Sequence, residues 1–147
     1  MSRVAEKSLS GIAVVLVNPP LRITPNFVNY PLFAGLGVLY NAAWLERLGA
    51  QGSVADAFVS GSKEVPIWTD DRLWQIGCPP DELVREMEET PDVIVIGTSM
   101  FAHPGRLKAT LLPELIERVA ERFPKTPLVL ADLYCGGLDY LPYEPRR

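Results

Sequence analysis

Three apolar runs constrain the fold of this chain more than any other feature. Each consists of strand-forming residues with no polar side chain alternating inside it: Ile12 to Val17, Val93 to Ile96, and Leu128 to Ala131. Strands of this kind are covered on both faces, as in a parallel sheet. We therefore expect the runs to be buried parallel strands, with Ser53 to Phe58 as a weaker fourth strand nearer an edge.

Helical patterns lie between these runs. Residues 36–48 end at Gly49, residues 80–90 begin with Pro80 and acidic side chains, and residues 106–123 repeat apolar residues at spacings of three and four. Pro113 marks either a kink or the first turn of the last helix. The first helix would place these residues near one face: Leu36, Leu39, Tyr40, Ala43 and Leu48. The alternation of strands and helices predicts an α/β fold with a doubly wound parallel sheet.

Composition limits the class of protein. The 147 residues suit a single domain, 1–147, and the formal charge of −4 argues against a nucleic-acid partner. The two cysteines lack metal-binding spacing and fit free thiols in a reduced cytoplasm. No apolar segment is long enough for a membrane span, so we expect a cytoplasmic protein without a membrane partner. Residues 59–77 carry Trp68 and Trp74, and we expect them to pack on the domain or on a partner.

Ligands of open parallel sheets bind outside the carboxyl ends of the strands. A catalytic function has little support there, because the GxSxG, Walker lysine, HExxH and GxGxxG motifs are all absent. His103 suits either a ligand or base, or a solvated loop residue, and Asp56 is only a weak ribose-binding signal. Gly136 and Gly137 follow the last strand, where they permit positive φ and leave bare backbone. They suit either a tight turn or the close approach of a ligand.

Four segments together resemble a known family. VVLVNPP, PLFAGLGVLYNAAWLERLGAQGSVADAF, GCPPDELVREMEETPDVIVIGTSM and PLVLADLYCGG are similar, in order and spacing, to the N-terminal cobalamin-binding domain of cobalamin-dependent radical S-adenosylmethionine enzymes. The resemblance covers residues 11–138. It implies a flavodoxin-like, Rossmann-like sheet that binds cobalamin across the carboxyl ends of its strands.

The resemblance also implies which residues contact the cofactor. The first turn would face the corrin ring, while the residues after the third strand and the glycine pair would line the cleft for the nucleotide tail. The implied cofactor-binding residues are Asn18, Pro19, Pro20, Thr98, Ser99, Met100, Gly136 and Gly137. No histidine follows the first strand, so cobalt would have no histidine lower ligand from this chain, and we predict no protein metal site.

Two departures from the family restrict the function. The CxxxCxxC motif of the iron–sulfur cluster is absent, so we expect the chain not to be catalytic alone. Only four strands are evident and the fifth is missing, which predicts a homo-oligomer or a radical-enzyme partner or domain. The alternatives are a structural or interaction subunit with the same fold and an empty cleft, and an enzyme acting on a nucleotide or flavin. The substrate and methyl acceptor are not identified by the sequence.

Overall fold

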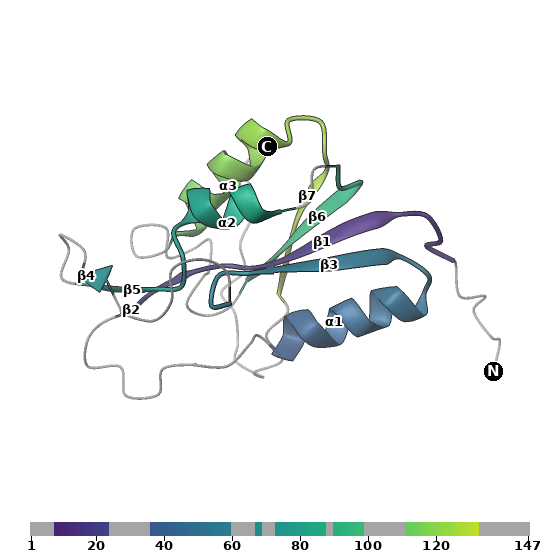
Figure 1. The fold of residues 1–147 in the computed structure, drawn as a ribbon, viewed down its shortest axis with the longest axis horizontal. Helices are drawn as coiled ribbons and strands as arrows, with labels where there is room; N and C mark the ends of the chain where they lie inside the picture. Colours follow the sequence, from purple (N-terminus) through teal and green to yellow (C-terminus); the bar gives the residue numbers. More distant parts are fainter. Residues whose placement is uncertain are drawn as a thin grey trace.

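A computed structural model describes residues 8–23, 36–59, 67–68, 73–87, 90–98 and 111–132 (Figure 1). The strands are β1 (Ala13–Asn18), β2 (Leu21–Ile23), β3 (Gln51–Asp56), β4 (Ile67–Trp68), β5 (Trp74–Ile76), β6 (Val93–Thr98) and β7 (Leu128–Asp132). The helices are α1 (Leu36–Arg47), α2 (Pro80–Glu86) and α3 (Leu112–Arg122). Within these described segments, no helix has the length and apolar content to cross a membrane.

The three apolar runs and the weaker fourth strand form one parallel sheet, as predicted. Its 4-stranded order is β3-β1-β6-β7, so β1 lies between the second and third parallel strands along the chain. β3 is an edge strand, which confirms the expectation for Ser53 to Phe58. This parallel sheet with helices on both faces has the α/β, flavodoxin-like architecture.

Helices α2 and α3 cover one face of the parallel sheet (Figure 1). Val15 and Val17 of β1 and Ile94 and Ile96 of β6 point to this face because side chains alternate along a strand. These four residues are at most 1% exposed, and they pack with Leu83, Val84, Leu112, Leu115 and Val119 of the helices. Pro113 lies in the first turn of α3, where its missing N–H leaves no helical hydrogen bond unmade.

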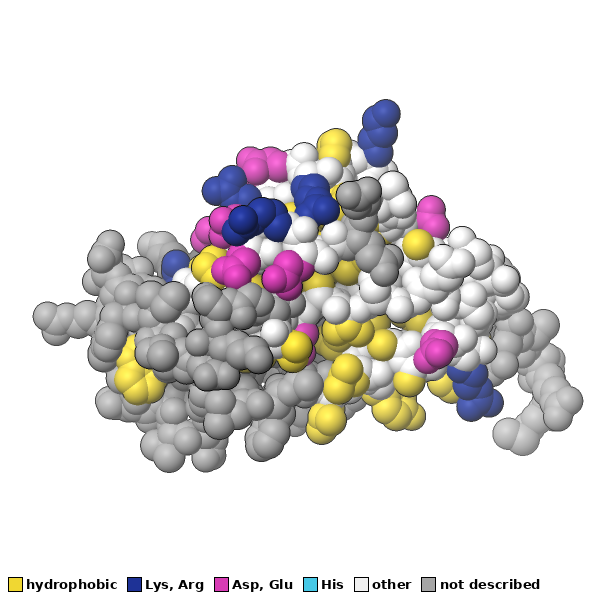
Figure 2. Space-filling model, in the orientation of Figure 1, with side chains coloured by type: hydrophobic (Ala, Val, Ile, Leu, Met, Phe, Trp, Pro, Cys, Tyr) yellow, Lys and Arg dark blue, Asp and Glu magenta, His cyan; other side chains and the backbone are white. Residues whose placement is uncertain are grey.

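Helix α1 lies on the opposite face, and its orientation differs from the expected one. Leu36 and Tyr40 are 78% and 77% exposed, and Leu39 and Ala43 are also exposed, whereas Val38 is buried. The sheet-facing side therefore runs through Val38, Asn41, Ala42 and Leu45, which recur at helical spacing. The sequence pattern misled because α1 has apolar residues on several sides. Figure 2 shows the hydrophobic side chains that remain on the surface over α1.

A second, 3-stranded antiparallel sheet has the order β2-β5-β4. β2 begins at Leu21, directly after the two prolines that follow β1, and pairs with β5 so that Leu21 lies opposite Ile76. Both of these residues are buried. The segment 59–77 therefore does contain ordered strands, and its Trp74 is partly buried in the domain.

Candidate functional site

The carboxyl ends of β1 and β6 meet at the point where strand order reverses. Val17 of β1 lies opposite Ile96 of β6, so Asn18 and Thr98 end neighbouring strands. The chain leaves β1 toward β3 through α1 on one face, and leaves β3 toward β6 through α2 on the other (Figure 1). Connections that diverge in this way leave room above the strand ends, which is where ligands bind in open α/β sheets.

Asn18 is held in place by a carboxylate from the neighbouring edge strand. Its Nδ2 donates a hydrogen bond to Oδ1 of Asp56 at 3.0 Å, and the backbone N–H of Phe58 donates to the same oxygen at 2.9 Å. A carboxylate only accepts hydrogen bonds, so the pairing fixes which side of the Asn18 amide faces Asp56. The amide Oδ1 of Asn18 is thereby left on the other side, as an acceptor.

Among the residues that the structure describes, Asp56 is the one charged residue that is buried, with 7% of its surface exposed. Because its Oδ1 already accepts two hydrogen bonds within the protein, Asp56 serves to hold Asn18 and the turn at Phe58. A role of Asp56 as a ribose-binding acid stays a prediction. Its role as the partner of Asn18 was not foreseen, although two polar residues at the ends of adjacent parallel strands are a signal for such a pair.

The turn after β3 is fastened to both β1 and the start of α2. The N–H of Ala57 donates to the Asn18 carbonyl at 3.1 Å, and the N–H of Cys78 donates to the Ala57 carbonyl at 2.8 Å. Gly77, directly before Cys78, has a φ of +88°. A Cβ atom at this position would lie 3.0 Å from the carbonyl oxygen of Ala57. Glycine is therefore required at position 77 for both its backbone conformation and its close approach.

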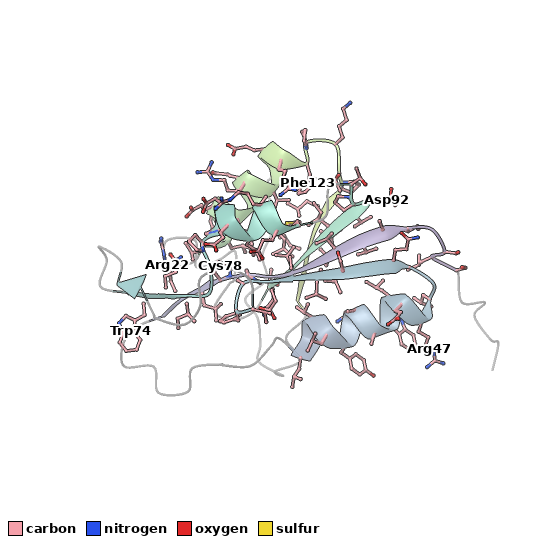
Figure 3. The ribbon with its side chains drawn as sticks, viewed as in Figure 1. Arg22, Arg47, Trp74, Cys78, Asp92 and Phe123 are labelled. Atoms are coloured by element: carbon pink, nitrogen blue, oxygen red, sulfur yellow. The ribbon has the colours of Figure 1, made fainter. Side chains whose placement is uncertain are left out.

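Cys78 lies at the entrance to α2 (Figure 3) and is 2% exposed. Burial, reinforced by the negative charges of Glu82 and Glu86, raises the pKa of its thiol to about 11. A thiol with so high a pKa stays protonated near neutral pH and is a poor nucleophile or metal ligand. Cys78 is thus an apolar part of the core, as expected for a free thiol.

The structure describes four of the eight predicted cofactor-binding residues. Asn18 and Thr98 are partly buried at neighbouring strand ends, whereas Pro19 and Pro20 are buried, so Asn18 offers the more accessible surface of that turn. Ser99, Met100, Gly136 and Gly137 lie outside the described residues, as does His103. In the part of the chain that is described, no cluster of three or more potential metal ligands occurs.

Comparison with known proteins gives one informative similarity. The chain is 32% identical over 131 residues to cytidylyl-2-hydroxyethylphosphonate methyltransferase of Streptomyces wedmorensis. The similarity covers 78% of this chain but 24% of that protein, so the chain spans about a quarter of the length of this relative. No established protein-family model matches the chain. No solved structure matches it either. The chain is accordingly a distant relative of one part of a methyltransferase.

Proposed function

We propose that this chain is a cobalamin-binding module related to the N-terminal domain of cobalamin-dependent radical S-adenosylmethionine methyltransferases, and that it is not catalytic alone. The observation that carries the proposal is the similarity to the Streptomyces methyltransferase, taken together with the sequence resemblance to cobalamin-dependent radical S-adenosylmethionine enzymes. A match to a quarter of that enzyme is what a shared binding module would give. The relationship agrees with the sequence resemblance, which rests on residues 11–138.

The strand ends provide suitable groups for such a cofactor. Asn18, oriented by Asp56, would offer its amide oxygen to a donor on the ligand, and the Thr98 hydroxyl can donate or accept. Gly97 and Ala131 lie opposite one another near the same edge of the sheet and add little bulk there. When bound, cobalamin supplies a cobalt that carries a methyl group. This chain would hold the cofactor by its ring edge and tail, without a histidine ligand to the metal.

Retention of hydroxocobalamin after desalting tests this function, read from the visible spectrum of the protein fraction. We expect wild type to retain the cofactor at about micromolar concentration and Thr98→Val to bind about three- to tenfold more weakly, because the variant loses one hydroxyl. Thr126→Val is the matched control, since Thr126 donates to the Pro91 carbonyl before the start of β6, at the other end of the sheet. Equal binding by all three proteins, or by none, would contradict the proposed site.

An interaction subunit with the same fold is the second candidate, and the edge strand β7 favours it. Val129 and Leu130 point to opposite faces of the sheet, and they are 44% and 38% exposed. β7 pairs with β6 alone among the described strands. An edge of this kind suits a second copy of the chain or a partner domain. Sedimentation as a dimer, without retained cobalamin, would favour this candidate over the module.

A further inference from the structure

Arg22 is a cation beside the candidate site with no described partner for its side chain. It lies on β2, in the strand that begins three residues after Asn18. Its Nε is buried and has no hydrogen-bond acceptor within the protein. Figure 3 shows Arg22 beyond the carboxyl end of β1, whereas Asp92, which binds the first residue of β1, lies at the opposite end of the sheet.

The other described arginines all have contacts, which sets Arg22 apart. Arg122 donates to the carbonyls of α2, and Arg85 and Arg118 pair with Asp81 and Glu121 on helix surfaces. Arg47 lies over the ring of Trp44, with its Cζ 5.3 Å from the ring centroid. Buried polar groups in proteins are almost always hydrogen-bonded, so a buried guanidinium N–H without an acceptor indicates a missing partner.

Strand geometry directs the Arg22 side chain to the face of the small sheet opposite that of Leu21. Leu21 is 6% exposed and lies opposite the buried Ile76, so this face of the small sheet packs inward. Side chains alternate along a strand, and Arg22 therefore points to the other face, where it lies opposite Gln75. Arg22 is four positions after Asn18, so their Cα atoms lie within about 14 Å, the span of a nucleotide-sized ligand.

We infer that Arg22 binds a phosphate group of the ligand held at the carboxyl ends of β1 and β6. The planar guanidinium matches phosphate oxygens with paired, charge-assisted hydrogen bonds. This inference rests on the proposed function where the phosphate is the phosphodiester in the cobalamin tail. A free nucleotide monophosphate would present the same oxyanion, so the experiment separates these two sources.

Two corrinoids distinguish a phosphate contact from a contact with the ring. Cobinamide carries the corrin without the phosphate and nucleotide, so loss of the Arg22 charge should leave its affinity unchanged. In equilibrium dialysis, we expect Arg22→Gln to bind hydroxocobalamin at least about tenfold more weakly than wild type. Arg22→Lys should recover part of that loss, because it keeps the charge without the fork. Arg85→Gln, which removes an exposed arginine, is the control and should match wild type.

The Tm of the ligand-free protein distinguishes a ligand contact of Arg22 from a role in holding the fold together. Arg22→Met keeps the aliphatic stem and removes the unpaired N–H, so its Tm should equal or exceed that of wild type. A lowered Tm would assign Arg22 to the fold and overturn the inference. Equal loss of cobalamin and cobinamide in Arg22→Gln, or no loss of either, would also overturn it.

Titration with cytidine monophosphate separates this inference from the proposed function. If wild type binds neither corrinoid but binds the nucleotide, and Arg22→Gln does not, the cobalamin function fails while the phosphate contact stands. If wild type binds cobalamin and Arg22→Gln binds it equally well, the function stands and the Arg22 inference fails. Binding of none of the three ligands by wild type would overturn both.

Discussion

Cys78 shows how one buried side chain responds to its place in the fold. Its backbone N–H joins the turn after β3, and its thiol lies in the core beneath α2, near the carboxylates of Glu82 and Glu86. Burial and these charges both disfavour the thiolate, so the native thiol keeps its proton to a higher pH than a thiol in water. This difference links the folding equilibrium to pH.

We predict that Cys78 makes the protein lose stability as the pH rises from about 9 to 11. The pKa is raised from 9.0 to about 11, so the native state binds more protons than the unfolded state within that window. The stabilisation is therefore fully present below pH 9 and is lost as the pH approaches 11. Urea unfolding at pH 8 and 10.5 should show wild type losing about 2 kcal/mol more than Cys78→Ala. Parallel losses in the two proteins would contradict the raised pKa.

At the scale of elements, Arg122 joins α3 to the end of α2. Its guanidinium donates to the carbonyls of Val84 and Met87, the latter at 3.1 Å. Val84 lies in the last turn of the seven-residue α2 and Met87 is its C-cap, where backbone carbonyls lack the full set of helical donors. A cation there also complements the negative end of the helix dipole. So short a helix depends on this cap and on its packing against α3.

Replacing Arg122 by alanine should therefore destabilise the fold by about 2 kcal/mol, because two charge-assisted hydrogen bonds are lost at a partly buried site. Arg118→Ala is the matched control on the same helix. The Arg118–Glu121 pair, at 3.1 Å, is exposed to water on both sides, so its loss should change stability far less. Chemical denaturation of both variants at neutral pH measures the difference. Equal destabilisation would show that the Arg122 cap contributes no more than a surface ion pair.

The parts of the fold that follow from periodicity could be predicted from the sequence. The unbroken apolar runs gave the parallel strands, and α3, whose apolar residues fall on one side, packs as its pattern indicates. The predicted orientation of α1 was wrong, because its apolar residues lie on several sides and form no single stripe. The bond between Asn18 and Asp56 and the lack of a described acceptor for Arg22 Nε depend on how separate segments meet in space, so sequence spacing alone did not reveal them.

At the scale of the whole molecule, the two ends of the sheet have different roles. At the amino end, Asp92 accepts a hydrogen bond from the N–H of Ala13 at 2.8 Å and joins β6 to β1. At the carboxyl end, Asn18 and Thr98 place an oriented amide and a hydroxyl at the strand-order reversal, and Arg22 follows on β2, four positions after Asn18. The first arrangement is satisfied within the protein, whereas the second has polar groups that a ligand would complete.

Mapping hydroxocobalamin on the folded protein tests the central claim most directly. In a titration followed by ¹H–¹⁵N correlation spectra, the account predicts saturable shifts at the carboxyl end, in the amides of Asn18, Ala57 and Thr98. The amides of Ala13 and Asp92, at the amino end, should remain unchanged and serve as internal controls. No saturable shifts, or shifts confined to the amino end, would contradict the claim that this chain binds cobalamin at the reversal of strand order.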